Sequence, residues 1–173
     1  MAVLRRVRDV TQSEFQDFYQ AKRDMCLRSV LASVGDRALA EDLVAEAFTR
    51  AWVSWHTVRH HPAPSAWIVR TALNTRVSWW RRRRREVALE SDLEVAATEN
   101  GDAGLDVVLL AVLRRLPPRQ REVIVFRVFL DLDTKTTAGV LGIAPGTVTA
   151  HLSRAVATLR DQLITVDHLE VGS

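Results

Sequence analysis

Apolar residues recur along this chain at intervals of three and four, and no stretch alternates apolar and polar positions for long enough to predict a strand. The period predicts helices near residues 11–34, 37–55, 65–82, 106–116, 118–130, 134–141 and 145–163. Residues 86–104 lack a clear apolar face, so we interpret them as a flexible acidic linker. The pattern predicts an all-α protein of two small helical domains. The expected divisions are an N-terminal domain over 1–85, a C-terminal domain over 105–163 and a tail over 164–173.

Charge is unevenly distributed along the 173 residues, although the formal net charge is only +3. Residues 1–85 hold sixteen Arg or Lys against eight Asp or Glu, whereas residues 86–106 hold seven acidic residues and no basic one. A basic front half favours a polyanionic partner. Cys26 is the single cysteine, and the sequence shows no secretory signal and no apolar run of membrane-spanning length. We therefore expect a cytoplasmic protein without membrane insertion.

The predicted helix over 37–55 combines a core-facing stripe with a charged surface. Asp36 can cap its N-terminus, and Leu39, Leu43 and Ala47 follow at steps of four residues. The remaining surface carries Glu41, Asp42, Glu46, Thr49 and Arg50. Two interpretations stay open for this surface, a solvated helix face or a docking site for a basic protein partner.

The predicted helix over 65–82 follows Pro64, with Ser65 as its expected N-cap. One face is apolar, through Val69, Leu73, Val77 and Trp80. The other face mixes a ring, cations and hydrogen-bonding groups at Trp67, Arg70, Thr71, Asn74, Ser78 and Arg81. Such a face suits single-stranded nucleic acid, because cations neutralise phosphates, rings stack on bases and an amide can read a base edge. Core packing is the competing interpretation for each tryptophan, while the arginine run 81–85 favours phosphate contact.

Residues 133–163 have the pattern of a helix-turn-helix. Asp133 is an expected N-cap, Gly142 stands where a left-handed C-terminal residue is needed, and Pro145 opens the last helix. In DNA-binding units of this kind the second helix enters the major groove. Its expected exposed residues are Thr147, Thr149, Ala150, His151 and Arg154. A helical hairpin without a DNA role is the alternative. Upstream, the segment 123–129 is apolar on nearly every face, which predicts either a deeply buried helix or a surface docked on a partner.

Catalytic and metal-binding functions are disfavoured. His60 and His61 are adjacent in a proline-rich loop without acidic or cysteine residues close by, and no phosphate-binding glycine loop or nucleophile motif is present. We expect no enzymatic activity, no metal site and no cofactor. A stand-alone helix-turn-helix regulator is the alternative function, but it would leave the charged helix and the Trp–Arg helix without a role.

Three segments, in this order, resemble the extracytoplasmic-function (ECF) sigma factors of the sigma-70 family. They are Gly35–Trp52, Ala66–Glu86, and the pair Leu116–Arg121 with Gly146–Arg160. Phe48-Thr-Arg-Ala-Trp52 resembles the actinobacterial SigE-like group more narrowly. The resemblance implies a subunit that binds core RNA polymerase and directs initiation at promoters, with an anti-sigma factor as a further partner.

The resemblance also implies a role for each segment. The first would bind the β′ clamp helices of core polymerase through Asp42, Leu43, Glu46, Thr49 and Arg50. The second would melt and read the −10 element through Trp67, Arg70, Asn74, Arg76, Arg81, Arg82 and Arg83, with Asn74 capturing a flipped base. The third would read the −35 element through Thr147, Thr149, Ala150, His151 and Arg154, while helix 118–130 faces the β flap. Small residues at several of these last positions predict weak direct base readout.

Overall fold

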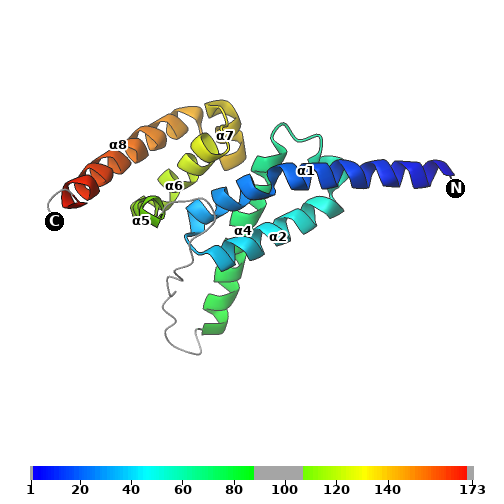
Figure 1. Cartoon of the computed structure of the whole chain (residues 1–173), viewed down its shortest axis with the longest axis horizontal. Helices are drawn as coiled ribbons and strands as arrows, with labels where there is room; N and C mark the ends of the chain where they lie inside the picture. The colour runs from blue at the N-terminus through cyan, green and yellow to red at the C-terminus, as the bar shows by residue number, and fades with distance from the viewer. Residues whose placement is uncertain (1, 88–106, 171–173) are drawn as a thin grey trace.

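The computed structural model describes the backbone of residues 2–87 and 107–170, with side chains described within 10–78 and 107–162. Its elements are α1 (Ala2–Val34), α2 (Arg37–Val53), α3 (Trp55–Val58), α4 (Pro64–Val87), α5 (Val107–Arg115), α6 (Pro118–Ile124), the π-helical turn η1 (Val125–Phe129), α7 (Thr134–Leu141) and α8 (Pro145–Glu170). The described residues contain no strand, so the all-α prediction is confirmed (Figure 1). We call α1–α4 the first unit and α5–α8 the second unit.

Several helix ends differ from the sequence-based predictions. α1 begins at Ala2 rather than near residue 11, and α8 continues to Glu170, beyond the expected end at 163. α4 begins at Pro64, which places Ser65 inside the helix and not at the N-cap. Val77 is 50% exposed, so the predicted apolar stripe of this helix stops before it. Residues 88–104 of the expected linker lie outside the described residues.

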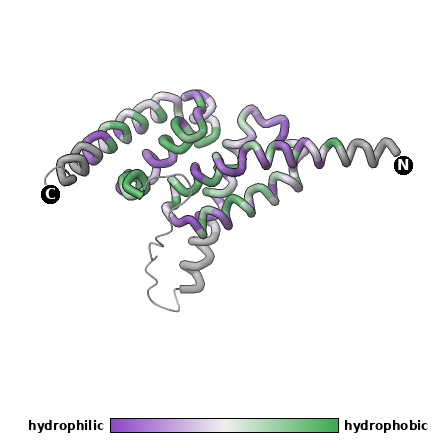
Figure 2. The backbone as a smooth tube through the Cα atoms, in the orientation of Figure 1, coloured by the Kyte–Doolittle hydropathy of each residue, from purple (hydrophilic) through white to green (hydrophobic). Residues whose placement is uncertain are grey.

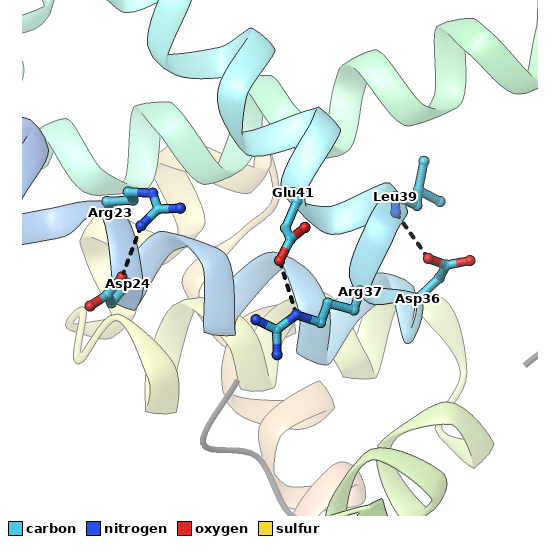
Figure 3. A network of polar contacts seen from close by, with 6 residues as sticks. All are labelled: Arg23, Asp24, Asp36, Arg37, Leu39 and Glu41. Carbon is cyan, nitrogen blue, oxygen red and sulfur yellow. Dashed lines mark hydrogen bonds and ion pairs between the residues drawn. The ribbon is translucent and has the colours of Figure 1, made fainter. Parts of the chain in front are cut away.

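The first unit is built by contacts among α1, α2 and α4. α2 starts where the sequence predicts because the Asp36 carboxylate accepts a hydrogen bond from the Leu39 backbone N–H at 2.9 Å (Figure 3). One turn further, Arg37 and Glu41 form an exposed ion pair of 2.9 Å, which adds only a few tenths of a kcal/mol. The Asp36 cap therefore fixes where the helix begins.

An aromatic cluster holds α1 against the C-terminal half of α2 and the start of α3. The Phe15 ring lies 5.0 Å from Trp52 and 5.2 Å from Trp55, centroid to centroid. Tyr19 meets Phe48 edge-on at 4.9 Å. Contacts at these distances add about 0.5–1.5 kcal/mol per pair beyond the burial of area. The large rings of the first unit thus serve mainly its core.

The second unit confirms the predicted helix-turn-helix signals. The Asp133 carboxylate accepts from the Thr136 N–H at 2.7 Å, Gly142 is left-handed with a φ of 66°, and α8 starts at Pro145. The helix expected over 118–130 changes to a π-helical turn at Val125. α5 is apolar along most of its length (Figure 2). None of the described helices has both the length and the apolar character required to cross a membrane.

The two units share one hydrophobic core. α1 contacts α5, α6 and η1 of the second unit, and α4 contacts α7. Val123, Val125 and Phe126 are fully buried, as the buried-helix interpretation predicts, whereas Val128 is 60% exposed. Because η1 packs on α1, its apolar residues stabilise the closed arrangement of the two units.

Hydrogen bonds from two arginines reinforce this arrangement at the C-terminal end of α1. Arg121 donates to the Ser33 carbonyl at 3.0 Å across the boundary, and to the carbonyls of Leu113, Arg114 and Leu116 within the second unit. Arg114 donates to the Gly35 carbonyl. We call Ser33 and Gly35, together with Arg114 and Arg121, the seam.

Candidate nucleic-acid interface

One face of α4 carries Trp67, Arg70, Thr71 and Asn74, as the spacing of three and four residues predicts. Asn74 is exposed, whereas the other three are half-buried. The opposite face packs into the core, where Val69 and the neighbouring apolar side chains are inaccessible to water. The buried face holds the backbone of α4 in place and leaves the amide of Asn74 free to meet a ligand.

This face of α4 borders an open hollow of about 500 Å³ beneath the C-terminal end of α2. The hollow is lined by Thr49, Arg50, Val53, Ser54, Trp67, Thr71 and Asn74. Its walls offer an indole ring, hydroxyls, an amide and one guanidinium. A flat aromatic ligand with hydrogen-bonding edges, such as a single unstacked base, matches this combination of groups.

Arg76 does not lie with Asn74, contrary to the sequence-based grouping. Two residues along a helix are separated by about 200° around its axis, so neighbouring positions of this kind point in nearly opposite directions. Arg76 is half-buried, and it lies close enough to Arg121 of the second unit for their charges to interact. Burial lowers the pKa of Arg76, and the charges of Arg76 and Arg114 add to burial in lowering the pKa of Arg121.

Arg70 is engaged by the second unit. Its guanidinium lies 4.0 Å from the carboxylate of Glu122 on α6, and the same carboxylate lies 2.9 Å from Arg119. Sequence reasoning did not identify Glu122 as a partner of Arg70. The two residues are 52 positions apart, and no sequence motif contains both of them. Val53 and Ser54 of the hollow were missed as well, since nothing local marks the end of α2 as a wall of a site.

The exposed side of α2 leads into the same hollow. Asp42 and Thr49 are exposed and Glu46 is half-buried, while Arg50 forms an ion pair with Glu46 at 2.8 Å. Leu43 is fully buried in the core of the first unit. Its grouping with the docking residues is therefore corrected, because a side chain without exposed surface cannot touch a partner directly.

On the second unit, α8 presents a mostly small and polar surface. Thr147, Thr149, Ala150 and Arg154 are exposed, whereas His151 is half-buried and its Nδ1 has no hydrogen-bond partner among the described residues. The Thr149 hydroxyl is directed back to the Pro145 carbonyl at 3.3 Å. Arg154 is then the one described cation within this set of residues.

The side chains of Arg81, Arg82 and Arg83 lie outside those described, although their backbone continues α4. Within the described ranges, no three His, Cys, Asp or Glu side chains converge into a group that could hold a metal ion.

Comparison with known proteins gives consistent matches over both units. Residues 18–86 match the Sigma-70 region 2 family, and residues 106–159 match the Sigma-70, region 4 family. The chain is 35% identical over 159 residues to the RNA polymerase sigma-E factor of Streptomyces coelicolor, covering 89% of this chain and 88% of that protein. It is 34% identical over 140 residues to the ECF RNA polymerase sigma factor SigL of Mycobacterium tuberculosis, covering 77% and 79%.

A solved structure matches both units together. The sigma factor RpoE of Bartonella quintana, in its complex with the anti-sigma factor NepR, superposes with a TM-score of 0.75 at 25% identity. The superposition covers 87% of this chain and 96% of the other, so it spans the first and the second unit. Their closed arrangement therefore has a counterpart in an experimental structure.

Proposed function

The chain belongs to the sigma-70 family of RNA polymerase sigma factors, in its ECF group, and on this basis we propose that it binds core RNA polymerase and directs promoter-specific initiation of transcription. The observation that carries the proposal is the hollow between α2 and α4, where the exposed side of α2 meets Asn74. One surface for the polymerase and one for an unpaired base are thus contiguous. The protein acts in the cytoplasm as a binding subunit, and the catalytic step belongs to the polymerase.

The exposed side of α2 is the proposed contact with the β′ clamp helices. Asp42, Glu46 and Thr49 present acidic and polar groups, which complement a basic partner, and Arg50 is oriented by Glu46. Leu43 supports these residues from the core without contacting the partner. Helix α6 and η1 are the proposed contact with the β flap, which requires them to separate from α1 in the holoenzyme.

The hollow is the proposed binding place of one flipped base of the −10 element. Extracting a base from the duplex costs a few kcal/mol. Stacking on an aromatic side chain returns about 1–3 kcal/mol, which Trp67 supplies from the wall of the hollow. Asn74 reads the edge of the base, and Arg70 with the arginine run 81–83 neutralises the neighbouring phosphates. Arg76 is left out of this set because it lies on the other face.

The N-terminal half of α8 is the proposed reader of the −35 element. Thr147, Thr149 and Arg154 are exposed for phosphate contacts, and His151 and Ala150 line the same surface. Few of these side chains can form paired hydrogen bonds with a base edge. Binding therefore depends mainly on the DNA backbone and on the shape of the groove.

The functional divisions proposed are residues 1–85 for polymerase binding and −10 recognition, 86–104 as a linker, 105–163 for −35 recognition and 164–173 as a tail. We also propose an anti-sigma factor as a partner. The support is the structural relative, which was solved with its own anti-sigma factor and has the two units arranged alike.

Reconstituted transcription tests the proposal. Wild-type chain and core RNA polymerase are assayed by run-off transcription on DNA fragments of varied sequence, and promoter melting is followed by permanganate reactivity. Asn74→Ala should reduce open-complex formation by about 10- to 100-fold, the value of a lost base contact, with core binding unchanged. Gln16→Ala, which removes an exposed amide from α1, is the control.

Two outcomes would count against parts of this proposal. If Asn74→Ala abolished core binding, Asn74 would not be the base-capturing residue. If the wild-type chain failed to direct initiation with core polymerase yet bound duplex DNA tightly alone, a stand-alone regulator would replace the sigma-factor assignment.

A further inference from the structure

Glu122 is the only acidic residue between positions 107 and 129, a segment that carries five arginines. Its carboxylate is turned toward the first unit, 4.0 Å from Arg70, and its side chain is only 23% exposed. On the other side of the contact, positions 64–78 of α4 contain no acidic residue. Among the described side chains, the carboxylate that forms an ion pair with this face of α4 therefore belongs to the second unit.

Arg70 and Asn74 are one helical turn apart on the same face of α4, so a phosphate next to a base bound at Asn74 would approach the Arg70 guanidinium. A carboxylate at 4.0 Å competes for that charge. We propose that Glu122 occupies Arg70 in place of a DNA phosphate when the two units are closed, and that the second unit thereby inhibits DNA binding by the first. This inference rests on the proposed function of the α4 face.

The same boundary contains contacts that hold the closed state and one that opposes it. Arg121 donates to the Ser33 carbonyl at the end of α1, and Arg114 donates to the Gly35 carbonyl. Arg76 and Arg121 repel each other, and among the described side chains Arg76 has no ion-pair partner. Glu122 is the carboxylate that brings attraction to this cationic boundary, so neutralising it shifts the balance toward opening.

We call the Glu122–Arg70 contact the latch. Cysteine labelling tests whether it holds the two units closed, because the labelling rate of a buried thiol is proportional to the population of the open state. Ser33→Cys and Val125→Cys place one thiol on each side of the boundary, at positions that are 6% and 0% exposed. Cys26 is fully buried in the first unit, and burial raises its pKa to about 12, so it reports only unfolding. The labelling rate of each cysteine variant is measured with Glu122 present and again in combination with Glu122→Gln.

Glu14→Gln is the matched control. Glu14 forms an ion pair of 2.7 Å with Arg59 inside the first unit, so its neutralisation changes the net charge equally without touching the boundary. Glu122→Gln should raise the labelling rate at both introduced thiols about two- to fivefold, the range for a partly exposed ion pair. Cys26 labelling should stay unchanged, and so should every rate in Glu14→Gln.

A second measurement tests inhibition itself. The apparent affinity of the free chain for a short single-stranded DNA oligonucleotide of mixed sequence should rise by the same factor as the labelling rate, and by more than in Glu14→Gln. Equal labelling rates in Glu122→Gln and Glu14→Gln would show that the Glu122–Arg70 contact does not hold the two units closed. Faster labelling without tighter oligonucleotide binding would overturn the inhibition. Failure of the proposed function would appear separately, as wild-type chain that does not initiate transcription with core polymerase.

Discussion

Replacing Gly35 by alanine should destabilise the chain by about 2–3 kcal/mol, through two effects that can be separated. Gly35 has a φ of 73°, where a Cβ costs about 1–2 kcal/mol. A Cβ there would also clash with the Arg114 guanidinium, so the guanidinium must move away. It then loses its hydrogen bond to the Gly35 carbonyl, a net loss of about 1 kcal/mol.

Gly142 provides the matched comparison. It has a φ of 66°, but a Cβ there would meet nothing within 4 Å. Gly142→Ala should therefore cost only the backbone term of about 1–2 kcal/mol. The difference of about 1 kcal/mol between the two variants measures the contact of Arg114 across the seam.

Urea denaturation followed by far-UV circular dichroism measures the loss of free energy of unfolding in Gly35→Ala and in Gly142→Ala. A double-mutant cycle with Arg114→Ala then tests whether Arg114 is the source of the difference. In the Arg114→Ala background the extra cost of Gly35→Ala should disappear, because the side chain that it displaces is gone. Equal costs for the two glycine variants would refute the reasoning. So would an extra cost that persists without Arg114, since the seam would then not be its source.

Asp36→Ala should lower the free energy of unfolding by about 1 kcal/mol through loss of the bond to the Leu39 N–H, whereas Asp36→Ser keeps a cap and most of the stability, as urea denaturation would measure. Native Cys26, whose pKa burial raises to about 12, should react with iodoacetamide at pH 8 far more slowly than in the unfolded chain, and mass spectrometry follows this directly; equal rates would contradict its burial. Hydrogen bonds from Thr136 hold the pKa of Asp133 below its usual 3.8, so its contribution to stability is complete above that value and is lost as the pH falls through the lower folded-state pKa. Melting temperatures of wild type and Asp133→Asn should therefore converge in acid, and an NMR titration of the Asp133 carboxyl checks the direction of the shift.

Local chemistry explains which structural predictions from the sequence were confirmed. The N-caps at Asp36 and Asp133 and the left-handed Gly142 lie where expected, because capping depends on a few adjacent residues. Ser65 was wrong as a cap because Pro64 itself starts the helix, as a residue that lacks a backbone N–H can. Local signals of this kind are decided within one turn of helix.

The candidate site was predictable in part. Helical spacing placed Trp67, Arg70 and Asn74 together, and the same spacing, applied strictly, would have excluded Arg76. The ends of the hollow, Val53 and Ser54, could not be predicted, because they become walls only when α2 packs across α4. Leu43 was grouped with the docking residues because the core-facing stripe of α2 lies directly beside its exposed charged face.

The sequence by itself determined the helical period, the caps, the order of the segments and the chemistry that each segment offers, since all of these follow from residues close in the chain. Only the tertiary structure decided what the apolar segment 123–129 contacts and which charges meet across the two units. Arg70 and Glu122, or Arg121 and Ser33, are brought together by the shared core after long separations in sequence. Their pairing depends on the packing of η1 against α1, and no local pattern carries that information.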